Sequence, residues 1–116
     1  MGTNGNDTIV GTPGNDVIVG LGGRDTIDGR GGNDIICGGD GNDNLVGGTG
    51  NDQISGGNGN DNVVGGPGDD ILNGDAGNDN IIGGPGNDTL NGGPDVDICR
   101  GGDGFNSFSA CETQGR

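Results

Sequence analysis

One aspartate recurs at every ninth residue of this 116-residue chain, without a single slip in register. Each one closes a glycine-rich segment of the kind Gly38-Gly39-Asp40-Gly41-Asn42-Asp43. Carboxylates beside backbone carbonyls are oxygen ligands that suit hard cations such as calcium. The spacing therefore predicts metal binding by Asp7, Asp16, Asp25, Asp34, Asp43, Asp52, Asp61, Asp70, Asp79, Asp88 and Asp97.

Calcium fits these residue types best, because it accepts about six to eight oxygen ligands in irregular geometry. We number the nine positions of each unit from its first glycine, so that the aspartate stands at position six. Glycine at positions one, two and four lets the backbone turn its carbonyls toward one point. Magnesium would require a stricter octahedron, and the chain has no histidine for zinc. The expected carbonyl ligands are those of Gly38, Gly39, Gly41, Gly47, Gly48, Gly50, Gly56, Gly57, Gly59, Gly65, Gly66 and Gly68.

The composition points to a cation as partner and excludes several others. Eighteen acidic residues face four arginines and no lysine, giving a formal charge of −14. Nucleic acid and anionic membrane surfaces need clustered basic residues, and no apolar run reaches the roughly 20 residues of a membrane span. With 25% hydrophobic residues and 33 glycines, the chain cannot build a conventional core. A disordered acidic segment is the alternative, and the strict period argues against it.

The residues between the aspartates indicate an all-β solenoid. The three residues after each aspartate, such as Thr8-Ile9-Val10, are too short for a helix and rich in β-branched side chains. Only the middle residue is apolar in every unit, so we expect it to point inward. Two nonapeptides make one coil of 18 residues, which predicts about six coils stacked ~4.8 Å apart. Loops 18 residues apart then form two columns of aspartates, one on each edge.

The end of the chain departs from the pattern. Residues 101–109 form a degenerate unit with Asn106 in the aspartate position and Phe108 in the inward position. Residues 2–109 are therefore the expected repeat domain, and residues 110–116 a C-terminal cap or tail. A disulfide between Cys99 and Cys111 would staple this cap, with two free thiols as the alternative. Cys37 has no obvious partner and is either a free thiol or a link between molecules.

From Gly2 to about Ser109 the units resemble the RTX calcium-binding nonapeptides, Gly-Gly-x-Gly-x-Asp-x-U-x with U large and apolar. The resemblance implies a right-handed parallel β-roll that needs calcium to fold and binds it between successive loops on each edge. Neighbouring aspartates in the two columns would then hold about nine calcium ions, with a tenth if the amide oxygen of Asn106 can substitute. Departures from the pattern, which leave their sites less certain, are Thr3, Thr12, Leu21, Arg30, Asp75 and Asp95-Val96.

These features predict a secreted, extracellular bacterial module that folds as it binds calcium. The alternative is a calcium-dependent self-assembling or cell-surface structural or adhesive protein, because the N-terminal coil begins at Gly2 with no polar cap and could stack on another molecule. Catalysis finds little support, since the chain lacks His, Lys and Tyr. A row of asparagines at position five has a structural interpretation as turn residues and a less favoured one as an ice-binding face: Asn6, Asn15, Asn33, Asn42, Asn51, Asn60, Asn78 and Asn87.

Overall fold

The computed structural model describes residues 2–111 and 113–115, which form short strands joined by loops. These residues contain no helix that is long and apolar enough to cross a membrane. The strands are β1 Thr8–Val10, β2 Val17–Val19, β3 Thr26–Asp28, β4 Ile35–Cys37, β5 Asn44–Val46, β6 Gln53–Ser55, β7 Asn62–Val64, β8 Ile71–Asn73, β9 Asn80–Ile82, β10 Thr89–Asn91, β11 Ile98–Arg100, β12 Ser107–Ser109 and β13 Thr113–Gly115.

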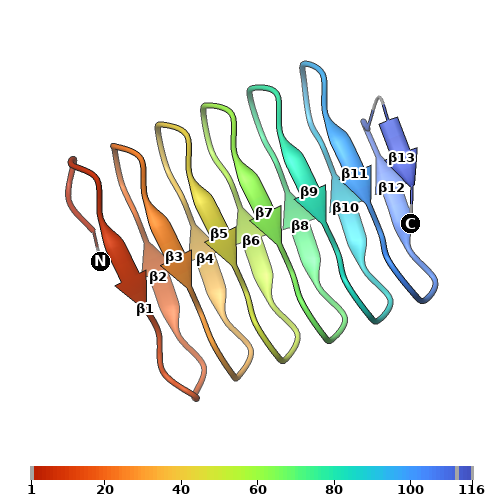
Figure 1. The fold of residues 1–116 in the computed structure, drawn as a ribbon, viewed down its shortest axis with the longest axis horizontal. Coiled ribbons are helices and arrows are strands. Elements are labelled where there is room, and N and C mark those ends of the chain that lie inside the picture. Colours follow the sequence, from red (N-terminus) through yellow and green to blue (C-terminus); the bar gives the residue numbers. More distant parts are fainter. Residues whose placement is uncertain (1, 112, 116) are drawn as a thin grey trace.

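Odd-numbered and even-numbered strands build two separate parallel sheets (Figure 1). One sheet runs in the order β1-β3-β5-β7-β9-β11-β13, and the other in the order β2-β4-β6-β8-β10-β12. Strands pair with the strand 18 residues away, as Ile27 does with Leu45 in β3 and β5. The predicted β-solenoid with two nonapeptides per coil and about six coils is therefore confirmed.

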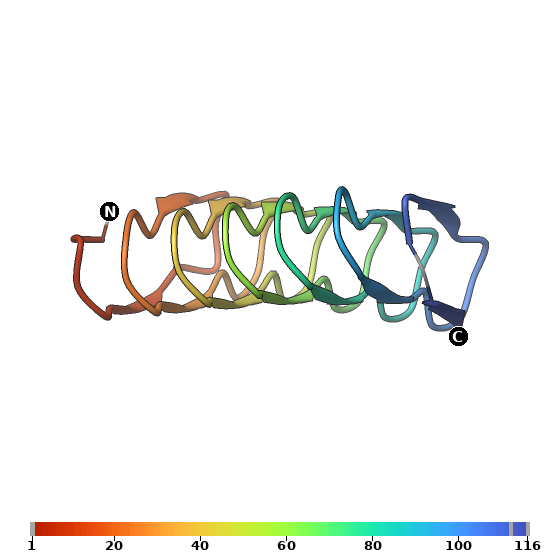
Figure 2. The same ribbon diagram turned by 90° about the horizontal axis from the view of Figure 1, so that it is seen from above.

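The solenoid is a flattened slab rather than a rod. Its extents are 34 × 31 × 13 Å, so each coil is nearly as wide as the stack is long. Figure 2 shows the two sheets as thin layers with the chain winding between them. The slab is thin because each strand sends one side chain inward, and wide because the six-residue loops extend sideways beyond the sheets. The loops thus form two long edges.

The core is a single file of inward side chains, one from each strand. Each is flanked along the chain by exposed or half-buried strand residues, which is the alternation predicted from the sequence. A file this narrow leaves the two loop edges without apolar support, so the loops must be held by polar interactions. The buried apolar residues are Ile18, Ile27, Ile36, Leu45, Ile54, Val63, Leu72, Ile81, Leu90 and Cys99.

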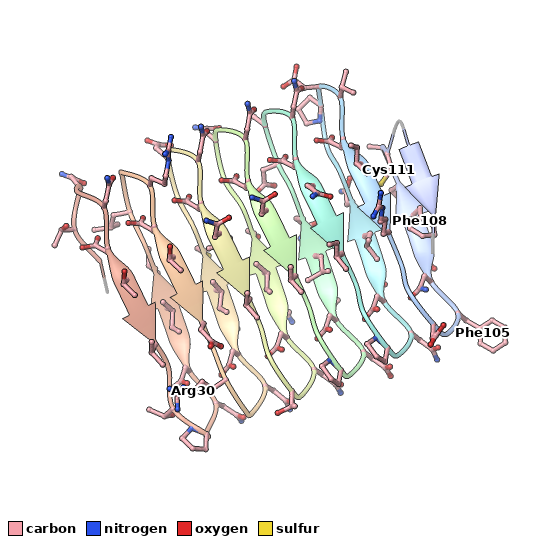
Figure 3. The ribbon with its side chains drawn as sticks, in the orientation of Figure 1. Arg30, Phe105, Phe108 and Cys111 are labelled. Carbon is pink, nitrogen blue, oxygen red and sulfur yellow. A yellow bond between two sulfur atoms is a disulfide. The ribbon has the colours of Figure 1, made fainter. Side chains whose placement is uncertain are left out.

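The C-terminal end is closed by a disulfide and by a strand that the sequence did not reveal. Cys99 and Cys111 are bonded, with their Cα atoms 5.9 Å apart, as predicted. Phe108 packs against the end of the core, and Figure 3 shows it near Cys111 while Phe105 points away from the slab. β13 pairs with β11, although Thr113-Gln114-Gly115 carries no apolar residue that marks a strand. Cys37 is a half-buried free cysteine.

Candidate metal centres

The repeated aspartates lie at the ends of the loops, just before each strand, and form the two predicted columns. The nine from Asp25 to Asp97 are buried, with at most 3% of each residue exposed. Asp7 and Asp16, in the first coil, are half-buried. Buried carboxylates require partners for both oxygens, because water no longer solvates them.

The first carboxylate oxygen, Oδ1, holds neighbouring coils together. The backbone N–H of Asp25 donates to Oδ1 of Asp43 at 2.8 Å. The same bond recurs along both columns, from Asp7 with Asp25 to Asp79 with Asp97. This bond requires an acceptor at position six of every loop, so it accounts for one half of each carboxylate.

The second oxygen, Oδ2, has no such partner in the inner loops. Burial raises the pKa of Asp61 to about 8, because desolvation penalises its charged form. The same cause raises the pKa of Asp70 and Asp79 to about 7. A cation beside these oxygens would remove the penalty. Within the described part of the chain, no hydrogen bond reaches the buried Oδ2 atoms of Asp25, Asp34, Asp43, Asp52, Asp61, Asp70, Asp79 and Asp88.

The glycine at position one keeps open the space that this oxygen faces. A Cβ on Gly38 would lie 2.7 Å from Oδ2 of Asp43 and 2.7 Å from the carbonyl oxygen of Gly56, in the next coil. Both distances are shorter than carbon–oxygen contact allows, so any side chain here would fill the space between the two oxygens. The carboxylate of one loop and a carbonyl of the following loop therefore both face the position that a side chain would occupy here.

Positions two and four turn their backbone into the left-handed region. In a regular loop both are glycine, as with Gly39 at φ 91° and Gly41 at φ 102°. Non-glycine residues adopt the same conformation where the sequence departs from the pattern: Leu21, Arg30, Asp75 and Asp95 all have φ between 66° and 78°. The carboxylates of Asp75 and Asp95 accept N–H groups from the preceding coil, at 3.1 and 3.0 Å. These departures therefore leave the backbone of their loops unchanged.

Asn106 shows which groups surround the atom that stands in the place of an aspartate Oδ2. Its Oδ1 accepts the N–H of Asp88 at 2.8 Å, so Nδ2 takes the place of Oδ2. Nδ2 donates to the carbonyls of Gly102 and Gly104 at 3.2 and 3.5 Å, at positions two and four of the same loop. An aspartate at this position would place its Oδ2, an acceptor, near the loop carbonyls, which are also acceptors. A cation between these oxygens can bind all of them. The amide oxygen of Asn106 is already used, which removes the basis for a tenth site.

A cation beside Oδ2 would therefore meet one carboxylate oxygen and backbone carbonyls. Among residues 2–111 and 113–115, no three His, Cys, Asp or Glu side chains gather to hold a metal. Carbonyl-rich, all-oxygen sites suit calcium, whereas zinc and copper favour nitrogen and sulfur ligands. The residues present fit calcium.

The sequence was compared with models of protein families. The model of the RTX calcium-binding nonapeptide repeat (4 copies) matches residues 1–36, 38–72 and 73–108. The chain belongs to this RTX family. Membership implies calcium binding, and the buried aspartate columns of this RTX chain are consistent with it. No curated protein and no solved structure matches the chain.

The first two RTX loops differ from the inner ones, at two of the positions where the sequence departs from the pattern. The N–H of Thr3 donates to Oδ2 of Asp7 at 2.6 Å, and the N–H of Thr12 to Oδ2 of Asp16 at 2.7 Å. The two threonine hydroxyls donate to the Oδ1 atoms at 3.0 and 2.8 Å. Asp7 and Asp16 thus have donors on both oxygens. Threonine in place of glycine at position two was the available signal.

The asparagines at position five are structural. Oδ1 of Asn42 accepts the N–H of Asn60 at 2.8 Å, and Oδ1 of Asn51 accepts that of Asp69 at the same distance. Equivalent bonds run along both edges of the RTX slab, between residues 18 apart. The row of amides is thus engaged in stacking the loops, as the structural interpretation predicted.

Proposed function

We propose that this protein is a secreted bacterial module that folds by binding calcium along its two loop edges. The observation that carries the proposal is the row of buried Oδ2 atoms without donors, from Asp25 to Asp88. Asp97 is a further candidate, because a Cβ on Gly92 would lie 2.6 Å from its Oδ2 and 2.5 Å from the carbonyl of Ala110. The expected load is therefore about nine ions, held by these carboxylates and by carbonyls of positions one, two and four.

Calcium supplies the positive charge that the chain lacks. At a formal charge of −14, coils that stack aspartates on both edges repel one another unless cations lie between them. Ions that bind only the folded state stabilise it by mass action, and about nine linked sites make the response steep. Extracellular calcium modules commonly bind with Kd of roughly 10⁻⁴–10⁻³ M, so this chain would stay unfolded where calcium is scarce.

A location outside the cell agrees with two features of the chain. The Cys99–Cys111 disulfide is of the kind that persists in oxidising compartments. Folding that waits for calcium would also keep the chain extended until it leaves the cytosol. We propose no catalytic activity, because RTX repeats are generally structural and the chain has no His, Lys or Tyr.

Far-UV circular dichroism during a calcium titration tests this function. The metal-stripped protein should show little β structure at neutral pH and gain it sharply at sub-millimolar to millimolar calcium. Magnesium should fail to replace calcium, and EGTA should reverse the change. Full β structure in EGTA at neutral pH, unchanged by added calcium, would contradict the proposal.

A further inference from the structure

We propose that Thr3, Thr12 and Asn106 terminate the two calcium columns by placing hydrogen-bond donors where the inner loops need a cation. This inference rests on the proposed calcium function and adds which loops take no ion. It also reverses the expectation that the N-terminal coil offers a surface for end-to-end stacking.

The backbone of the first two loops differs from that of all ten later loops. From Leu21 to Gly102, the residue at position two has positive φ in every unit. Its carbonyl faces position two of the next coil, as that of Gly39 faces Gly57. Thr3 and Thr12 do not have positive φ, and neither do Gly5 and Gly14 at position four. In these two loops the peptide N–H of the threonine faces the carboxylate instead. A donor therefore lies beside Oδ2 in these two loops, whereas no donor reaches Oδ2 in the inner loops of the described chain.

The threonine hydroxyl supplies the second missing donor. In the inner coils, Oδ1 of each aspartate accepts the N–H of the aspartate one coil earlier, as Asp25 does from Asp7. Oδ1 of Asp7 accepts the Thr3 hydroxyl, and Oδ1 of Asp16 accepts the Thr12 hydroxyl. The hydroxyls also accept the N–H groups of Gly5 and Gly14, at 3.1 and 3.2 Å, which fixes their orientation. Both carboxylates are therefore satisfied without metal.

Asn106 closes the C-terminal end of the loop edge that precedes the even-numbered strands. Its Nδ2 donates to the carbonyls of Gly102 and Gly104, the groups at positions two and four that would face a following loop. On the odd-numbered edge the corresponding end is covered by the turn at Ala110, which the Cys99–Cys111 disulfide ties down. Three of the four column ends thus carry donors in place of a half-formed calcium site, and at the fourth the carbonyl of Ala110 completes the candidate site of Asp97.

Two consequences follow. Asp7 and Asp16 belong to the repeat by sequence yet hold no ion, so calcium is confined to the loops from Asp25 onward. The end faces present no open ligand set to a second molecule, so calcium should fold the protein without linking copies end to end. The calcium sites thus form two stacks that end at these closures.

Ion counting by native mass spectrometry of the calcium-loaded full chain tests the assignment. Replacing both Asp7 and Asp16 by Asn should leave the number of bound ions unchanged. Replacing both Asp43 and Asp52 by Asn, the same chemical change two coils further on, should remove two ions. Loss of two ions from the Asp7→Asn/Asp16→Asn variant would overturn the proposal.

A gain-of-site variant provides the converse test. Thr3→Gly/Thr12→Gly gives both loops glycine at positions one, two and four, as in Gly83–Asp88, and should raise the count by one or two ions. Thr49→Gly is the matched control, because Thr49 is an exposed residue at position three with no hydrogen bond to a carboxylate, and its count should stay at the wild-type value. If the double variant bound no more ions than the wild-type protein, the proposed role of the two threonines would be contradicted. If the wild-type chain bound no calcium, the proposed function would fail first.

Light scattering tests whether the ends are closed, independently of the ion count. The wild-type protein should remain monomeric at saturating calcium, whereas Thr12→Gly combined with Asn106→Asp exposes complementary half-sites on one edge. That variant should associate in calcium and dissociate in EGTA. Calcium-dependent association of the wild-type chain would show that its ends are not closed.

Discussion

Oδ1 of Asp43 accepts the backbone N–H of Asp25 at 2.8 Å, across one full coil of 18 residues. The other oxygen of Asp43 is buried beside the carbonyl of Gly56 and accepts no hydrogen bond. One carboxylate therefore carries two separate roles, because one oxygen sets the stacking of coils and the other creates a demand for a cation. The two roles can be separated by mutation.

Replacing Asp61 by Asn should keep the stacking bond and remove the demand for metal. The amide oxygen can accept the N–H of Asp43, while the amide N–H₂ donates to loop carbonyls as Asn106 does. Since a buried polar atom without a partner costs about 1–3 kcal/mol, the metal-free variant should be more stable by a similar amount. It should also bind one calcium ion fewer. Circular dichroism in EGTA measures the metal-free stability, and ion counting measures the calcium load.

Asp40→Asn is the control for that substitution. Asp40 lies at position three, exposed, and accepts the side-chain amide of Asn58 at 3.0 Å, which an asparagine oxygen can also do. Its ion count should equal that of the wild-type protein. Equal losses in the two variants would show that net charge, rather than the buried oxygen, controls binding.

Adding one methyl group at Gly38 should destroy one calcium centre. The new Cβ would lie 2.7 Å from both Oδ2 of Asp43 and the carbonyl of Gly56, and such overpacking typically costs about 1–3 kcal/mol. Gly38→Ala should raise the calcium midpoint of folding and lower the ion count by one. Gly22→Ala should change neither, because its Cβ would meet no atom closer than 3.5 Å. A Gly38→Ala protein that loads like the wild type would place the ion elsewhere.

The metal-free protein should gain β structure as the pH falls. Burial raises the folded-state pKa of Asp61 to about 8 and that of Asp43 to about 6, above the ordinary value of 3.8. At pH values between about 3.8 and 8, the folded state therefore binds more protons than the unfolded state. The resulting stability is full below pH ~3.8 and is lost as the pH rises through about 6 to 8.

Circular dichroism of metal-stripped protein from pH 4 to pH 9 would measure this dependence. Protons and calcium neutralise the same oxygens, so saturating calcium should flatten the curve above neutral pH. Asp61→Asn should shift the metal-free transition toward higher pH, because it removes the carboxylate with the highest of these pKa values. A metal-free protein that unfolds on acidification would reverse the expected sign.

Breaking the Cys99–Cys111 bond should loosen the last coil. The bridge closes a loop of 12 residues, which the chain-entropy model values at about 3 kcal/mol. Cys111→Ser should lower the free energy of unfolding in calcium by roughly this amount and increase hydrogen exchange in β13. Cys37→Ser should have little effect on either quantity, since that thiol is free. Reducing agent should reproduce the Cys111→Ser change in the wild-type protein and have no effect on Cys111→Ser.

The repeat by itself determined the period, the two aspartate columns and the inward file from Ile18 to Cys99. These features follow from local pattern, because a strict nine-residue spacing allows one way to stack identical units. Family membership and calcium as ligand were predictable for the same reason. The flat shape of the slab and the strand β13 were not, because no side-chain pattern encodes them.

Only the tertiary structure decided which oxygens need a cation. Asp7 and Asp43 occupy the same position of the repeat, yet Thr3 satisfies one and no hydrogen bond from the described residues reaches Oδ2 of the other. Likewise Asp75 breaks the sequence pattern but keeps the loop backbone, with φ 66° and a side chain that accepts the N–H of Gly57. The balance of donors and acceptors depends on which way each loop peptide turns. That orientation is fixed by contacts with the coil 18 residues away, which a nine-residue motif does not specify.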